Sequence, residues 1–197
     1  MSYTIRSART GDVPVIRKLI DANVDSGRLL SKATVTLYED IQEFCVAELS
    51  GNSEPILAGC GAVHVLWEDL AEIRTVAVRE DCQGLGIGHA IVHNLIERCR
   101  LLGVRRVFVL TFAVDFFASH GFKPINGTPV APEVYRELLR SYDEGVAEFL
   151  DLERVKPNTL GNIRMLRHVL QGPVEMNTLV AHFATQAGTR DRRGRSL

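Results

Sequence analysis

Residues 70–88, LAEIRTVAVREDCQGLGIG, decide how this chain folds, because they lead from an apolar run through a cluster of glycines into a helical pattern. Leu70–Val78 is mostly apolar and β-branched, which predicts a buried strand. The segment Gln83–Gly88 that follows opens a helix, which Gly103 is expected to end as a C-terminal glycine cap. Apolar residues recur along one face of that helix at Ile87, Ile91, Leu95, Cys99 and Leu102.

A glycine-rich turn between a strand and a helix can hold a phosphate group. Glycine lets the backbone approach an anion closely, and the N–H groups of the first helical turn point toward it. The dinucleotide fingerprint G-x-G-x-x-G would need glycine at His89, and a Walker A loop would need Gly-Lys-Ser/Thr. The spacing Q/R-x-x-G-x-G/A does fit, at Gln83, Gly86 and Gly88. A tight turn without a ligand is the alternative, and it leaves glycines that weaken a helix unexplained.

The composition is that of one globular domain. The chain has 197 residues, of which 46% are apolar and 24% charged, and its formal net charge is −1. No apolar run approaches the roughly 20 residues of a membrane-spanning helix, and residues 1–17 carry no signal-peptide core. The four cysteines stand singly, and His89 and His93 lack the glutamate of H-E-x-x-H. We expect a cytoplasmic protein with no metal, membrane or nucleic-acid partner.

Strands and helices are expected to alternate around the central segment. Apolar patterns and turn signals predict strands at Tyr3–Arg6, Phe44–Leu49, Ile56–Leu66 and Arg106–Leu110. Helical spacing predicts helices at Val13–Val24, Val35–Glu43 and Val114–His120. Phe122 is expected to begin the last strand, and residues 127–170 have a mainly helical pattern. The basic segment 188–197 is expected to be disordered, with nucleic-acid contact as an outlying alternative.

The order of these pieces resembles the GNAT superfamily of N-acetyltransferases. In that family Q/R-x-x-G-x-G/A binds the pyrophosphate of acetyl-CoA, and Glu72–Val78 looks like the strand before it. Phe117–Phe122 resembles the family's next helix-to-strand corner. A closer resemblance, to short stand-alone actinobacterial acetyltransferases of the N-acetylglutamate synthase type, extends to about Leu166. Its supporting segments are Leu37-Tyr38, Gln42–Phe44, Cys60–Ala62, His64–Trp67, Phe108–Thr111, Gly145–Leu152, Val155–Asn158 and Leu160–Asn162.

This resemblance implies an α/β (α+β) fold, in which a mixed central sheet has splayed middle strands and helices on its faces. Residues 1–170 would form the acetyltransferase domain, and residues 171–197 a C-terminal extension that is partly disordered. The implied reaction moves acetyl from the cosubstrate acetyl-CoA to the α-amino group of glutamate or glutamine, as in the first step of arginine biosynthesis. The implied partner is this small amino acid, and a homodimer is left open.

The resemblance also implies roles for individual residues. Arg74 and Thr75 would border the amino-acid site, where Lys32, and after it Arg164, would bind carboxylates. For Lys32 the alternative is a solvated side chain, and for Arg74 a surface ion pair. Contacts to CoA are implied for Val76, Ala77, Val78, Gln83, Gly84, Leu85, Gly86, Ile87, Gly88 and His89.

Glu72 is the candidate general base, acting directly or through water, because it lies near the implied position of the thioester. Its alternative role is that of a solvated strand carboxylate. Many members of the family carry a tyrosine that protonates the leaving thiolate where this chain has Phe117, so Thr111 is the candidate replacement. The thiolate can also leave unaided, since the pKa of a thiol is about 8.5.

Two other functions remain open at this point. One is acetylation of protein N-termini or lysines, for which residues 127–166 would either form part of a peptide groove or close it. The other is a non-catalytic acyl-CoA sensor that uses the same phosphate-binding turn to change a contact with a partner.

Overall fold

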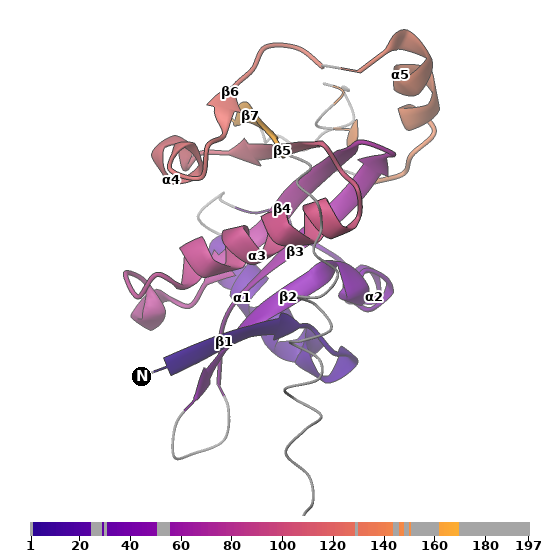
Figure 1. Cartoon of the computed structure of the whole chain (residues 1–197). Coiled ribbons are helices and arrows are strands. Elements are labelled where there is room, and N and C mark those ends of the chain that lie inside the picture. The colour runs from indigo at the N-terminus through magenta and orange to yellow at the C-terminus, as the bar shows by residue number, and fades with distance from the viewer. Residues whose placement is uncertain are drawn as a thin grey trace, which may run out of the picture.

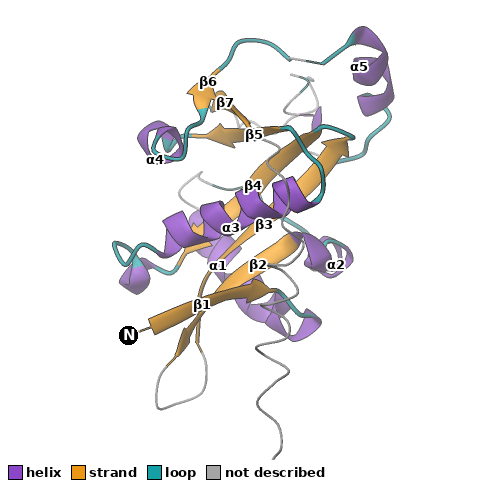
Figure 2. Ribbon diagram, in the orientation of Figure 1, coloured by secondary structure: helices purple, strands orange, loops and turns teal. Residues whose placement is uncertain are grey.

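The computed structural model describes residues 2–24, 29, 31–50, 56–128, 130–143, 146–147, 150 and 162–169. A mixed seven-stranded sheet in the order β1-β2-β3-β4-β5-β7-β6 forms the centre of the molecule. Helix α3 crosses one face of this sheet and α1 covers the other (Figures 1 and 2). Within the described ranges, no helix is long and apolar enough to cross a membrane. The expected segment 188–197 and the extension from residue 171 lie outside the described residues.

The first half of the sheet is an antiparallel meander. Its register pairs Tyr3 with Leu49, Cys45 with Gly61 and His64 with Glu72. The strands confirm the sequence prediction within a residue or two at each end: β1 (Ser2–Ser7), β2 (Phe44–Ser50), β3 (Ile56–Trp67) and β4 (Leu70–Val78).

The helices around this meander also follow the predicted apolar spacing. The predicted helix at Val35–Glu43 is shorter than expected, because α2 ends at Glu39 and a 3₁₀ turn covers Ile41–Glu43. Gly103 has a φ of 79°, so it ends α3 as a left-handed cap. The helices are α1 (Val13–Val24), α2 (Thr34–Glu39), α3 (Ile87–Leu101) and α4 (Val114–Ala118).

Strands β4 and β5 (Arg106–Thr111) run parallel but pair over a short stretch only. The register begins with Leu70 opposite Arg106 and ends with Glu72 opposite Phe108. The two strands therefore separate beyond Glu72, and the expected splay in the middle of the sheet is confirmed.

The second half of the sheet differs from the prediction. Phe122 does not begin the last strand, because β6 (Lys123–Pro124) is a two-residue edge strand and β7 (Ile163–His168) lies between it and β5. The helical pattern assigned to residues 127–170 is correct for α5 (Pro132–Leu138) and wrong for β7. In β7 only Met165 is fully buried, so the strand shows no alternation of apolar and polar residues.

Helix α3 lies very close to β3 because two glycines of β3 face it. A Cβ atom at Gly61 would lie 2.7 Å from Ile91 Cγ2, and one at Gly59 would lie 2.9 Å from Ile91 Cδ1. The Gly59 Cβ would also come within 2.8 Å of the carbonyl oxygen of Ala77 on β4. Glycine at these positions thus sets the distance between the helix that follows the turn and the strands beneath it.

We expect Gly59→Ala to lower the free energy of unfolding by about 1–3 kcal/mol, since the added methyl group meets backbone that cannot move aside. Gly11→Ala is the matched control, because a Cβ there meets nothing within 4 Å, and its effect should stay within about 0.5 kcal/mol. Urea denaturation of both variants checks this. Equal stabilities would show that the helix can move away from the sheet without loss.

Candidate active site

A cavity of about 530 Å³ occupies the space where β4 and β5 separate. One wall comes from β4 and the other from the end of β5 and α4, while Gln83 and Gly88 lie at the glycine-rich turn. The remaining lining residues are Asn23, Leu29, Ile73, Arg74, Thr75, Val76, Ala77, Val78, Leu110, Thr111, Phe112, Ala113, Phe116 and Phe117. The splay of the sheet therefore produces a cleft that runs from the turn toward Arg74.

The β4 wall of this cleft is irregular at Thr75. Its φ is 59°, in the left-handed region that non-glycine residues rarely adopt, and the register with β3 shifts beside it, between Cys60 and Ala62. Such strain is concentrated at functional sites. Beyond Glu72, no described strand pairs with β4 on its β5 side, so the backbone N–H and C=O groups on that edge are available to a ligand.

The glycine-rich turn has a structural reason for each of its glycines. Gly84 and Gly86 have φ values of 79° and 78°, and Gly86 is the N-cap of α3. A Cβ atom at Gly88 would lie 3.4 Å from Cζ of Phe116. These glycines therefore set the shape of the turn, and its N–H groups begin a 15-residue helix. Both features suit a phosphate site.

Arg74 is the centre of a buried charge cluster at the far end of the cleft. Its side chain is 8% exposed. The guanidinium lies 2.7 Å from Asp143 Oδ2 and 3.0 Å from Glu43 Oε2, with Asp40 and Glu72 at 3.4 and 3.9 Å. The interpretation as a surface ion pair is therefore wrong.

The charges of this cluster depend on one another. For Arg74, burial acts to lower the pKa. The negative charges of Glu72, Asp143 and Glu43 together have a larger effect, so the pKa of Arg74 is raised above its ordinary value. For Asp143, burial acts to raise the pKa, but the charge of Arg74 has the larger effect. The pKa of this carboxyl is therefore lower than its ordinary value. The pKa of Asp40 is raised by burial and by Glu43. Arg74 thus stays protonated, and it holds Asp143 in the ionised form.

His64 extends the cluster toward β3. Its Nδ1 lies 2.7 Å from Glu43 Oε1, and it stands opposite Glu72 in the β3–β4 register. Glu72 itself is 4% exposed, so it is not the solvated strand carboxylate of the alternative interpretation. It does not line the cleft, and its Oε2 lies 3.9 Å from Nη1 of Arg74, which does.

The structure brings some of the remaining predicted residues to the cleft and leaves others outside it. Thr111 lines it, with its Oγ1 accepting the N–H of Ala113 at 2.9 Å. Lys32 does not line the cavity, and its charge is among those that oppose the rise in the pKa of Asp40. Arg164 lies on β7 opposite Leu110, one strand away. His89 contacts His120 Nε2 at 2.9 Å and packs against Phe116 instead of lining the cleft.

Several site residues were not predicted from the sequence. Asn23 and Leu29 reach the cleft from α1 and the segment after it, and Phe116 from α4. Asp40 and Asp143 reach Arg74 from positions far away along the chain. Of these residues, only Phe116 could have been found from the sequence, because it adjoins the helix-to-strand corner at Phe117–Phe122. No local pattern distinguishes the two aspartates from solvated surface carboxylates.

Comparison with known proteins identifies the class to which this fold and cleft belong. The model of the acetyltransferase (GNAT) family matches residues 20–122. An amino-acid acetyltransferase of Mycobacterium tuberculosis is 59% identical over 166 residues, which are 82% of this chain and 92% of that protein. The chain belongs to the GNAT acetyltransferase family.

Solved structures agree with this assignment. A Mycobacterium tuberculosis protein in complex with CoA and a second ligand has a TM-score of 0.81 at 57% identity, over 85% of this chain and 99% of that one. The N-acetylglutamate synthase of Neisseria gonorrhoeae, complexed with coenzyme A and N-acetyl-glutamate, has a TM-score of 0.67 at 28% identity. That match covers 86% of this chain and 36% of the longer Neisseria protein.

We expect Arg74→Met to lower the free energy of unfolding by about 3–5 kcal/mol at pH 7, because it leaves the buried Glu72 and three partly buried carboxylates without their cation. The folded-state pKa of Asp143 is lowered, so the stability it contributes is present above its unfolded pKa of about 3.9 and is lost as pH falls below it. The loss on substitution should therefore be smaller at pH 3.5 than at pH 7.

Urea denaturation at the two pH values measures this difference. Arg140→Met is the matched control, because Arg140 pairs with Glu137 at side-chain exposures of 77% and 49%, and its loss should stay below about 1 kcal/mol. If Arg74→Met lowered the free energy of unfolding at pH 7 by no more than the control does, the cluster would have no stabilising role.

Proposed function

We propose that this protein transfers the acetyl group of acetyl-CoA to the α-amino group of glutamate or glutamine. The observation that carries the proposal is the cleft between β4 and β5, which leads from the glycine-rich turn to a cluster of carboxylates around the buried side chain of Arg74. The similarity to the Mycobacterium tuberculosis amino-acid acetyltransferase supports the same reaction. We place this reaction in the cytoplasm and in arginine biosynthesis.

The two ends of the cleft suit the two substrates. The N–H groups at the start of α3 and the side chain of Gln83 would hold the pyrophosphate of acetyl-CoA. The free edge of β4 would pair with the pantetheine arm, and a backbone N–H near Val76 would stabilise the oxyanion of the reacting thioester. The carboxylates around Arg74 attract an ammonium group, so the amino acid would enter at that end, with Lys32 holding a carboxylate.

Proton transfer can be assigned to residues at the same end. Because Glu72 is buried and does not line the cleft, it would accept the proton of the amine through water. Thr111 Oγ1 accepts the Ala113 N–H, so its own hydroxyl hydrogen remains to be donated to the departing sulfur. Phe117, beside it in the cleft, supplies no proton.

The segment around α5 packs near the acceptor end of the site. Leu138, Val146 and Leu150 are buried in one apolar cluster with Leu70 and Phe108, below the point where the strands separate. Asp143 of the same segment bonds to Arg74. The contact with Asp143 brings the segment after α5 against Arg74 at the acceptor end of the cleft, which supports a free amino acid as the acceptor over a protein N-terminus or lysine.

A turnover screen tests the proposal. Release of CoA thiol should be fastest with free glutamate or glutamine. The kcat/KM for these amino acids should be at least tenfold higher than that for peptides with a free N-terminus, a difference in transition-state binding of about 1.4 kcal/mol. Faster turnover of the peptides would instead favour the protein-acetylating alternative. Tight acetyl-CoA binding without transfer to any amine would favour the sensor.

We expect Glu72→Gln to lower kcat at pH 7 by about 10²–10⁴-fold, the usual contribution of a general base. The dissociation constant of acetyl-CoA should stay unchanged, because Glu72 does not line the cleft. The loss should shrink as pH rises and more of the amine is neutral. Glu68→Gln is the control, since Glu68 is exposed on the turn between β3 and β4. A wild-type kcat in Glu72→Gln would remove this residue from catalysis.

A further inference from the structure

His64 contacts the charge cluster from β3 and has no part in the reaction described above. Its Nδ1 lies 2.7 Å from Oε1 of Glu43. A carboxylate only accepts hydrogen bonds, so Nδ1 carries the hydrogen atom and donates it. This donor is present in that tautomer of the neutral ring and in the protonated ring alike. The contact therefore does not require the ring to gain or lose a proton.

The carboxylate of Glu43 is held by both of its oxygens. Oε1 accepts the hydrogen bond of His64, and Oε2 lies 3.0 Å from Nη2 of Arg74. The backbone of Glu43 is fixed as well, because Arg98 donates to its carbonyl oxygen at 2.9 Å and its own N–H donates to the carbonyl oxygen of Asp40. Glu43 therefore links the position of the imidazole ring to that of the guanidinium.

The guanidinium of Arg74 has one donor left for a ligand. Nη1 lies 2.7 Å from Oδ2 of Asp143, and Nη2 is bonded to Glu43. Nε is buried and, among the residues that the structure describes, has no hydrogen-bond partner. A buried donor of this kind is unfavourable unless a ligand completes the hydrogen bond. Because Arg74 lines the cleft, an oxygen atom of the amino-acid acceptor can do so.

We propose that His64 is a positioning residue for the amino-acid acceptor. Through Glu43 it sets the orientation of the Arg74 guanidinium, whose Nε–H donates to an oxygen atom of the acceptor. This rests on the proposed function, in which a free amino acid binds at this end of the cleft. A planar guanidinium held at both Nη atoms has little freedom to turn. Loss of the His64 contact would release one of these two holds and weaken the bond from Nε–H.

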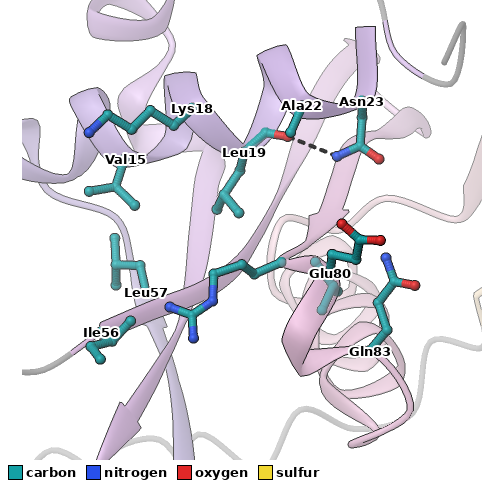
Figure 3. Close-up of a pocket in the computed structure, with 11 residues that line it drawn as sticks. Val15, Lys18, Leu19, Ala22, Asn23, Ile56, Leu57, Glu80 and Gln83 are labelled. Carbon is teal, nitrogen blue, oxygen red and sulfur yellow. Dashed lines mark hydrogen bonds between the residues drawn. The ribbon is translucent and has the colours of Figure 1, made fainter. Parts of the chain in front are cut away.

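The cosubstrate end of the cleft lies far from His64 along β3. Ile56 and Leu57, at the start of this strand, line a second cavity between α1 and the ends of β3 and β4 (Figure 3). Gln83 of the glycine-rich turn lines the same cavity. His64 follows Leu57 on the same extended strand at a distance of about 20 Å. A change at His64 is therefore expected to leave the binding of acetyl-CoA unchanged.

Three substitutions of His64 test the proposal through the KM for glutamate or glutamine. His64→Leu removes the donor and should raise this KM about tenfold, the effect of weakening one charge-assisted hydrogen bond. His64→Asn should restore the KM of wild type, because its amide nitrogen is attached to Cγ, as Nδ1 is. In His64→Gln the nitrogen lies one bond further out, so this variant should behave as His64→Leu does. The KM for acetyl-CoA should stay unchanged in all three.

The control and the contrary outcomes concern the same KM. His168→Leu is the matched control, because His168 is exposed at the end of β7, and it should change neither KM. A merely structural role of His64 would lower the folded fraction and the apparent kcat without changing KM. An unchanged KM for the amino acid in His64→Leu, or an equal rise in His64→Asn, would overturn the proposal.

A double-mutant cycle with Arg74→Lys tests whether His64 acts through the guanidinium. Lysine keeps a cation for the carboxylates but has no Nε–H, so Arg74→Lys by itself should raise the KM for the amino acid about tenfold or more. Adding His64→Leu to Arg74→Lys should then raise it no further. A second, additive loss would show that His64 acts by another route, and the proposal would fail.

Turnover by wild type tests the proposed function separately. If wild type acetylated peptides and not free amino acids, the proposed function would be contradicted. The His64 variants would then be compared by their KM for the peptide, and a loss in His64→Leu that His64→Asn restores would still support the positioning role. Normal turnover of glutamate or glutamine with no effect of His64→Leu on KM would contradict the positioning role alone.

Discussion

The separation of β4 from β5 beyond Glu72 and Phe108 is the constraint on which the rest of the site depends. Two neighbouring strands would otherwise satisfy each other's backbone groups, and no ligand could enter between them. The strained backbone at Thr75 and the register shift beside it change the course of β4 where the strands part. The glycines of β3 bring α3 close to the same strands, so the glycine-rich turn lies at the open end of the split.

The opposite end of the split is organised by charge. Arg74 draws Asp40 and Glu43 from the segment after α2 and Asp143 from the segment after α5 to the same face of β4 as Glu72. Arg98 of α3 adds to this arrangement by donating hydrogen bonds to the carbonyl oxygens of Gln42 and Glu43. The helix that begins at the glycine-rich turn therefore also contacts the segment that supplies Asp40 and Glu43 to the acidic end of the site.

Prediction from the sequence worked best where a feature depends on neighbouring residues. The strand Leu70–Val78 has the predicted bounds, and α3 follows the predicted apolar face, because period and glycine placement are local properties. The matched GNAT spacing likewise located the turn that begins α3. Strand β7 was assigned to a helical region because five of its six residues are at least partly exposed. Its partner β5 lies more than 50 residues earlier, and only that pairing makes it a strand.

The sequence by itself determined the elements from β1 to α4, the glycine-rich turn and the family, since each depends on residue types at short, regular spacings. Only the tertiary structure decided which charged residues belong to the site. Glu72 and Arg74 alternate with apolar residues just as solvated strand residues do, and burial alone distinguishes them. Asp143 lies 69 positions from Arg74, and the cleft between β4 and β5 is lined by residues from separate parts of the chain. Contacts of this kind depend on how packed elements meet in space, which no local spacing encodes.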